Sequence, residues 1–179
     1  MKKIYLAAAI LLTSAVCFSQ KNELKFNIPL AIYGMADISY ERLVADNMGV
    51  GISNAIGLDK PYDWQTAKGI PERAIICSYY RLYFSEKKKA AGFFVEGNMA
   101  VASQKETDYD YIYDPVTQTS FQQVITQSTT GFGFGAAVGF KLLTKNNIFG
   151  DFYGGWGRLF GKNVYNSYPR LGVCLGKRF

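Results

Sequence analysis

LGVCLGKRF, residues 171–179, is the stretch that decides the fold of this chain. Its alternate residues separate into two sets, one mostly large and apolar (Leu171, Val173, Leu175, Lys177 and Phe179) and one small or charged (Gly172, Cys174, Gly176 and Arg178). A soluble sheet would bury the apolar set in a core, which would then have to accept the chain end. A strand of a transmembrane barrel instead turns the apolar set toward lipid and the other set toward the lumen. The alternation therefore predicts a membrane-spanning β-strand.

The first twenty residues have the features of a secretion signal. Two lysines precede an apolar run over residues 4–16, and small residues stand three and one positions before Gln20, as signal peptidase requires. The apolar run is too short for a spanning helix. Lipidation at Cys17 is an alternative, although the residue before it is not small. We expect a signal peptide over residues 1–19 and one outer-membrane β-barrel domain over residues 20–179.

The composition favours a β-protein without membrane helices. The chain has 13 Tyr, 13 Phe and 18 Gly, and after the signal no window approaches the roughly 18 apolar residues of a spanning helix. A membrane protein without such helices must be a closed barrel, because lipid cannot satisfy the polar groups of an open sheet edge. Loss of the two signal lysines lowers the net charge from +6 to +4. That mild charge forms no basic stripe, so we expect no nucleic-acid partner.

Two cysteines follow the signal, Cys77 and Cys174, and both belong to the inward-facing sets of their strands. They form neither a disulfide framework nor a zinc spacing. A disulfide is conceivable in an oxidising compartment. However, their strands lie nearly opposite each other in an eight-strand ring, which is unfavourable for a bridge. We therefore expect two buried free thiols.

Eight segments alternate between apolar and polar residues and are separated by turn signals. We predict strands over residues 23–32, 37–44, 48–57, 73–84, 92–102, 122–142, 148–160 and 168–179. Their apolar stretches have the about nine to eleven residues that a tilted strand needs to cross the hydrocarbon. Pro29 is awkward in the first strand, because it removes a donor from the ladder. The predicted fold class is all-β, an eight-stranded antiparallel up-and-down transmembrane β-barrel.

The connections between the predicted strands alternate in length. Short polar turns follow the second, fourth and sixth strands, and longer loops follow the third, fifth and seventh. Outer-membrane barrels have short periplasmic turns and long outer loops, and an even strand count places both chain ends in the periplasm. We therefore expect residues 58–72, 103–121 and 161–167 to face outside and residues 85–91 to face the periplasm.

Three motifs carry a family resemblance: ISYER at residues 38–42, the glycine-spaced run at residues 131–140 and LGKRF at residues 175–179. With them, the chain after the signal resembles small eight-stranded outer-membrane barrels of the OmpA/OmpX type, most of all the compact versions common in Bacteroidota. The resemblance implies that Leu175 and Phe179 belong to the C-terminal signal read by the barrel-insertion machinery. A lysine stands third from the end, where this family usually has an aromatic residue.

Five charged residues belong to the inward-facing sets: Glu41, Arg81, Glu96, Asp151 and Arg178. Such residues can line a polar conduit or a catalytic cleft, or they can form a packed ion-pair network. Eight strands leave an interior that side chains just fill, and buried charges are tolerated only when they are paired and hydrogen-bonded. We therefore predict an ion-pair network in the lumen, in which Arg81 and Arg178 are the partners of Glu41 and Glu96.

The chain contains no histidine. The usual Ser–His and other histidine-base mechanisms therefore lack the group that accepts the nucleophile's proton, and no spacing of paired carboxylates supports an alternative. Asp108, Asp110 and Asp114 are candidate calcium ligands, but their spacing lacks the glycine and the closing glutamate of a calcium loop. We expect no catalytic residues, no metal and no cofactor.

TDYDYIYD, residues 107–114, is the best candidate for a recognition segment. Tyr109, Tyr111 and Tyr113 offer large, rigid contact areas at low entropic cost, and Asp114 adds negative charge. The alternative is an extended hairpin that rises above the membrane, with its tyrosines in the outer aromatic girdle.

These observations favour a non-enzymatic outer-membrane barrel with surface-exposed loops, acting as a structural, adhesive or accessory subunit of an outer-membrane complex. The expected partners are outer-membrane lipid, the barrel-insertion machinery and another outer-membrane protein. A narrow channel for small solutes or ions is the alternative, and it predicts unpaired polar groups in the lumen. A secreted lipocalin-like binding barrel is disfavoured, because the inward set is charged and the outward set is apolar.

Overall fold

The structure is a computed structural model that describes residues 21–32, 34–58, 62–63, 72–85, 89–114, 119–161 and 165–179. Eight strands form its main body: β1 (Asn22–Asn27), β2 (Met35–Ala45), β3 (Met48–Gly57), β5 (Glu72–Tyr83), β6 (Gly92–Asp114), β7 (Thr119–Leu143), β8 (Ile148–Phe160) and β9 (Ser167–Arg178). A short helix, α2 (Ile28–Ile32), and a two-residue strand, β4 (Tyr62–Asp63), lie in the connections. No helix in this described part is long and apolar enough to cross a membrane.

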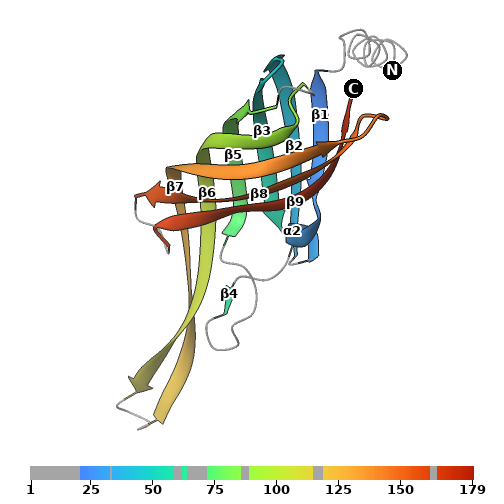
Figure 1. The fold of residues 1–179 in the computed structure, drawn as a ribbon. Coiled ribbons are helices and arrows are strands. Elements are labelled where there is room, and N and C mark those ends of the chain that lie inside the picture. The colour runs from blue at the N-terminus through green and yellow to red at the C-terminus, as the bar shows by residue number, and fades with distance from the viewer. Residues whose placement is uncertain are drawn as a thin grey trace, which may run out of the picture.

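The eight long strands close into a ring (Figure 1). Each pairs antiparallel with the strands next to it in the order β6-β5-β3-β2-β1-β9-β8-β7, and the β6–β7 pairing completes the circle. The first and last strands meet along a seam that runs from the pair Glu23–Arg178 to the pair Asn27–Cys174. The predicted fold, an all-β, eight-stranded antiparallel up-and-down barrel, is confirmed.

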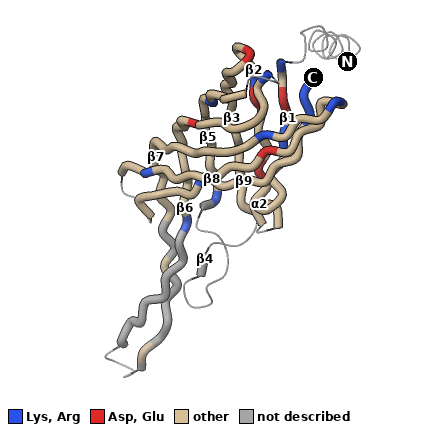
Figure 2. Tube along the Cα trace, viewed as in Figure 1, with Lys and Arg blue, Asp and Glu red and all other residues tan. Residues whose placement is uncertain are grey.

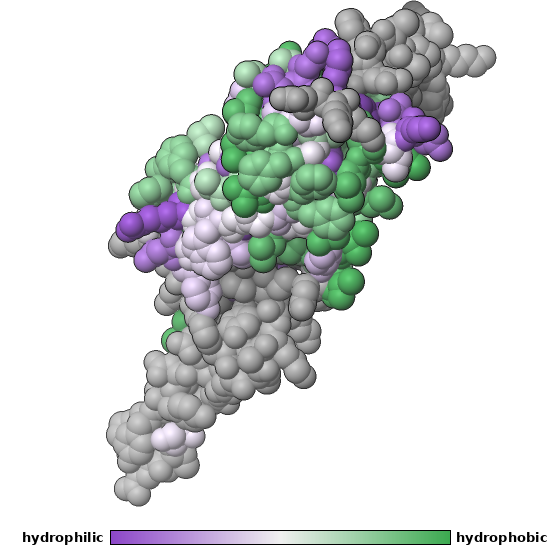
Figure 3. Space-filling model, in the orientation of Figure 1, coloured by the Kyte–Doolittle hydropathy of each residue, from purple (hydrophilic) through white to green (hydrophobic). Residues whose placement is uncertain are grey.

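Apolar side chains cover the outside of the ring and polar ones fill the inside. In β9, Leu171 and Leu175 are 58% and 57% exposed, whereas Cys174 and Arg178 are 3% and 5% exposed. The same alternation holds on the other ring strands, because successive side chains of a strand point to opposite faces. Figure 3 shows hydrophobic residues over much of the visible face of the barrel. The predicted phase of the C-terminal strand is confirmed.

Both described chain ends and the three short turns lie at the same end of the barrel (Figure 1). Backbone hydrogen bonds tie them together: the amide of Ala90 donates to the carbonyl of Asp46, and that of Arg178 to Asn147. The amide of Asn22 also donates to the carbonyl of Phe179. The short turns therefore share one end with the termini, as the sequence predicts, and the longer connections share the other end, called here the outer mouth.

The first strand is shorter than the sequence predicts. We expected it to continue to Ile32, but β1 ends at Asn27 and the chain turns into α2. Pro29 explains the change, because it has no N–H to donate to a strand ladder and its fixed φ suits the first turn of a helix. The alternating apolar residues of this segment therefore lie on a short helix at the outer mouth, not on the barrel wall.

Most of the segment at residues 103–121, expected to be a loop, is strand, which agrees with the extended hairpin given above as the alternative. β6 runs to Asp114 and β7 begins at Thr119, and the two stay paired over their whole described length. The pairing of β5 with β6 ends at Gln104, so the last ten residues of β6 extend past the barrel as a projecting hairpin (Figure 1). The loop expected at residues 58–72 contains β4, which pairs parallel with β6 at Glu106 and Thr107.

Candidate functional site

The interior of the barrel holds ten buried charged side chains among the described residues. Five are acids and five are bases: Glu23, Asp37, Glu41, Glu96 and Asp151, and Lys25, Arg81, Lys141, Arg170 and Arg178. They come from seven of the eight ring strands, each at an inward-facing position, and several lie on β1 and β2 near the chain ends (Figure 2). Because the two signs are equal in number, these ten side chains together carry no net charge when all are ionised.

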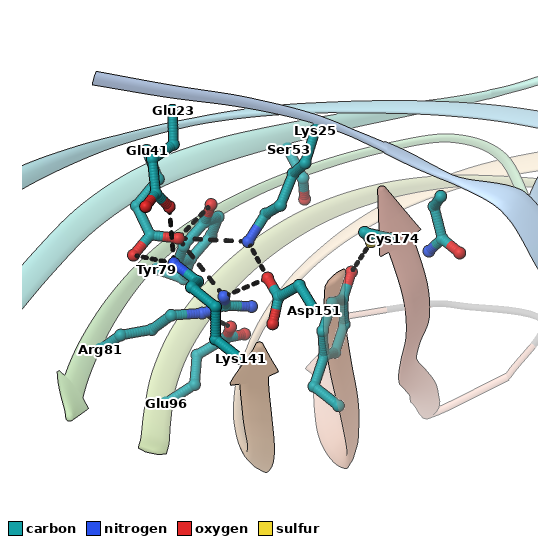
Figure 4. A network of polar contacts seen from close by, with 12 residues as sticks. Glu23, Lys25, Glu41, Ser53, Tyr79, Arg81, Glu96, Lys141, Asp151 and Cys174 are labelled. Carbon is teal, nitrogen blue, oxygen red and sulfur yellow. Dashed lines mark hydrogen bonds and ion pairs between the residues drawn. The ribbon is translucent and has the colours of Figure 1, made fainter. Parts of the chain in front are cut away.

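Arg81 of β5 is the centre of this set (Figure 4). Its Nε lies 2.7 Å from an oxygen of Glu96, and its Nη1 lies 2.6 Å from Asp151 and 3.3 Å from Glu41. The guanidinium also lies 4.1 Å from the ring centre of Phe94, a cation–π distance. Arg81 and its three carboxylates are fully buried, so their charges are balanced by one another and not by water.

Two lysines complete the centre of the network. Lys25 Nζ lies 2.6 Å from Asp151 and 3.1 Å from Glu41, and Lys141 Nζ lies 2.6 Å from Glu23 and 3.4 Å from Glu41. Glu41 therefore has three cationic neighbours, two lysines and Arg81. Glu41 and these three partners come from β2, β1, β7 and β5, so their contacts connect four strands across the lumen.

Arg178 closes the end of the barrel that carries the chain termini. Its Nη2 lies 2.6 Å from Glu23, and its guanidinium donates to the backbone carbonyls of Lys89 and Ala90 at 3.0 and 2.8 Å. Lys89 and Ala90 belong to the turn between β5 and β6, and Ala90 is buried with a φ of 44°. The turn is therefore folded inward over the lumen and held there from β9.

Arg170 extends the network toward the outer mouth. Its Nε lies 2.9 Å from Glu96, and its Nη1 donates to Ser53 at 3.1 Å. Glu96 thus accepts from two arginines, and the network is continuous from Arg178 at one end to Arg170 near the other. The arrangement balances charge inside the ring and leaves the side chains of Arg81 and its three carboxylate partners fully buried.

The structure places the five predicted lumen residues in two groups. Glu41, Glu96 and Asp151 all lie against Arg81. Arg178 lies apart, next to Glu23, so the predicted pairing of Arg178 with Glu41 or Glu96 is wrong. The sequence analysis did not single out the other partners of the network: Glu23, Lys25, Lys141 and Arg170. Strand phase could have found them, because each stands at an inward position between outward-facing residues.

The proposed recognition residues lie on the projecting hairpin. Tyr109, Tyr111, Tyr113 and Asp114 belong to β6, and Asp114 pairs with Thr119 of β7. The structure describes the backbone of these four residues, and their side chains lie outside its description. Their role in recognition stays a prediction.

The C-terminal residues and the cysteines also have defined positions. Leu175 and Phe179 face outward and are 57% and 44% exposed, which leaves their proposed role as an insertion signal a prediction. Cys77 of β5 and Cys174 of β9 are free and buried, so the structure agrees with the expectation of two buried thiols.

Comparison with known proteins adds one structural likeness. The closed ring of eight antiparallel strands, polar inside and apolar outside, defines the chain as an up-and-down β-barrel. It is similar to the crystal structure of the N-terminal β-barrel domain of Pseudomonas aeruginosa OprF, at 13% sequence identity and a TM-score of 0.47, over 90% of this chain and 98% of that one. No family model and no curated protein matches the sequence.

Proposed function

We propose that the protein is a non-enzymatic outer-membrane barrel that presents the β6–β7 hairpin at the cell surface, as a structural, adhesive or accessory subunit of an outer-membrane complex. The observation that carries the proposal is the combination of a filled lumen with a hairpin that extends ten residues past the barrel wall. A barrel whose interior is occupied by its own side chains has to act through what projects from it.

The exterior of the wall supports a position in a membrane. Its outward residues include exposed Leu, Ile, Val and Phe on all eight ring strands, a pattern that water would penalise and lipid accommodates. Closure of the ring leaves no strand edge within this band, as the hydrocarbon requires. The termini and short turns at one end suit the periplasm, and this supports an outer position for the hairpin.

The projecting hairpin is long enough to contact another protein. Ten residues of extended chain, from Lys105 to Asp114, span about 33 Å. Beyond β4 and β5 on one side and β8 on the other, the hairpin strands pair only with each other among the described residues, so their outer edges present free backbone groups. Such edges accept a further strand from a partner.

The test compares two variants of the full-length protein in its native membrane. Replacing Tyr109, Tyr111 and Tyr113 by Ser changes the hairpin, and replacing Phe132 and Phe134 by Leu changes the exposed wall while keeping it apolar. Both variants should fold, with wild-type amounts in the outer-membrane fraction. We expect only the hairpin variant to lose the proteins that copurify with wild type in mild detergent.

The opposite result, partners lost by the wall variant and retained by the hairpin variant, would place the interface on the barrel wall and contradict the proposal.

A narrow channel is the rival function, and conductance separates the two. Arg81 and its three carboxylates fill the cross-section with fully buried atoms, so we expect no ion conductance from purified protein in planar bilayers. Stable single-channel steps that change when Arg81 is replaced would show that ions pass the network and would favour the channel.

A further inference from the structure

The outer mouth of the barrel contains a cavity of about 250 Å³ inside the wall. Its lining is mainly apolar and comes from α2, β2, β3, β5 and β9, with Leu30, Met35, Ala55 and Ile75 among the contributors. Three polar side chains also line it: Asp37, Ser53 and Arg170. The cavity lies beyond the ion-pair network, on the side away from the chain termini.

Asp37 differs from the other buried charges of the described residues. It is 1% exposed, and of the ten it alone makes no ion pair. Asn27 donates to its Oδ2 at 3.0 Å, and its Oδ1 has no hydrogen-bond partner within the described protein. A buried carboxylate in this state is costly, because only a donor or a cation compensates its loss of water.

Arg170 supplies the complementary group on the same cavity. It is 6% exposed, and its Nε and Nη1 are used by Glu96 and Ser53. Its Nη2 has no partner among the described residues. The residues that line one cavity thus include an acid and a base that each have one buried atom without a hydrogen-bond partner among the described residues.

Asp37 and Arg170 reach the cavity from two different strands. Asp37 lies on β2 and Arg170 on β9, with β1 alone between these strands in the ring, and Arg170 stands four positions along β9 from Cys174, the partner of Asn27. Both side chains face inward, and Asn27 links the strands by donating to Asp37 and to the carbonyl of Leu171. Both side chains line the same cavity, so one small ligand within it has an acid and a base in reach.

We propose that this cavity binds a small zwitterion with an apolar body, of the size of an aliphatic amino acid, whose ammonium group meets Asp37 and whose carboxylate meets Arg170. Three observations select this chemistry. The walls are apolar, the two free polar atoms have opposite character, and the ten interior charges already sum to zero, so a ligand without net charge preserves the balance. The volume lies below the about 300–1,000 Å³ of pockets for larger ligands.

The experiment titrates detergent-purified full-length protein with L-leucine and with two analogues that each lack one charge, isoamylamine and 4-methylpentanoate. Calorimetry should show saturable binding of L-leucine, and each analogue should bind at least about tenfold more weakly, because it leaves one buried group unpaired.

Two variants locate the site. Asp37→Asn removes a charge that has no ion pair, so the barrel should keep or gain thermal stability while its affinity for L-leucine falls at least about tenfold. Asp46→Asn is the control, because Asp46 lies in an exposed turn at the opposite end and pairs with Lys89 at the surface. Its affinity should equal that of wild type.

The proposal is overturned if L-leucine shows no saturable binding up to about 10 mM, if Asp37→Asn binds it as wild type does, or if isoamylamine binds as tightly as L-leucine. The last result would indicate a site for cations. If Asp37→Asn does not fold, the comparison of the three compounds on wild-type protein decides alone.

Discussion

At the scale of single residues, the contribution of each buried charge to stability depends on how many oppositely charged groups it contacts. Arg81 contacts three carboxylates, whereas Arg178 contacts one carboxylate and two backbone carbonyls. A buried ion pair adds little to stability over an apolar pair of similar size, but loss of one member leaves the other buried and unpaired. The residue with the most carboxylate partners should therefore be the most sensitive to truncation.

Arg81→Ala should lower the free energy of unfolding by about 3–5 kcal/mol, because Glu41, Glu96 and Asp151 would share less positive charge. Urea titration of the refolded protein in detergent, followed by tryptophan fluorescence, measures the change. Arg158→Ala serves as the control, since Arg158 is exposed on β8. Equal midpoints for Arg81→Ala and wild type would show that the network contributes nothing to stability.

At the scale of strands, glycines and aromatic residues pair across the inner face. Five register pairs join a glycine on one strand to a Tyr or Phe directly opposite: Gly51–Tyr79, Phe94–Gly139, Phe149–Gly176, Tyr153–Gly172 and Gly157–Tyr168. A Cβ atom built on any of these glycines would lie within 2.4 Å of the opposite ring. The rings therefore lie flat over the glycine backbones, which lets large side chains fit inside a narrow barrel.

Gly172→Ala tests this pairing, because its Cβ would lie 2.3 Å from Cζ of Tyr153. The ring must move within a filled lumen, so we expect a loss of about 1–3 kcal/mol in the free energy of unfolding. Gly97→Ala is the matched control, since Gly97 faces outward and no heavy atom lies within 4 Å of its Cβ. It should change stability by no more than about 0.5 kcal/mol. Similar losses for both variants would indicate a general intolerance of alanine and refute the pairing argument.

At the scale of the whole molecule, the barrel has two different ends. One end carries the termini and short turns, tied by hydrogen bonds and closed by Arg178, and the other carries α2, the cavity and the hairpin. This asymmetry predicts a direction in a membrane, and the proposed function requires the compact end to face the periplasm.

Single cysteines at exposed positions test that direction. Ser120 lies near the far end of the hairpin, and Asn146 lies in the turn between β7 and β8, both exposed. Ser120→Cys should react with a membrane-impermeant maleimide on intact cells, and Asn146→Cys should react only after the outer membrane is permeabilised. The native Cys77 and Cys174 are buried and provide the unlabelled background. Reaction of Asn146→Cys alone on intact cells would reverse the orientation.

The sequence was sufficient to predict the bounds and the inward-facing residues of strands in which apolar and polar side chains alternate regularly. The strands at Met48–Gly57 and Ile148–Phe160 have the predicted bounds, and the inward phase of Glu41, Arg81 and Glu96 follows from the same alternation. The extended hairpin was expected only as an alternative, because its polar residues carry no apolar period, and backbone pairing between neighbouring strands does not need one. The end of β1 was missed because its apolar alternation continues past Pro29.

The amino-acid sequence by itself determined which side chains face outward and which face the lumen. A strand has a period of two, so the side of the barrel that a residue faces follows from its position in the strand. Only the tertiary structure decided which interior charges meet. Lys25 and Asp151 are 126 positions apart, and Glu23 and Arg178 are 155 apart. Their contacts exist because the ring closes between β1 and β9, which also leaves Asp37 without a partner charge at the outer mouth. Local alternation places a side chain inside, but strand order and closure select its neighbours.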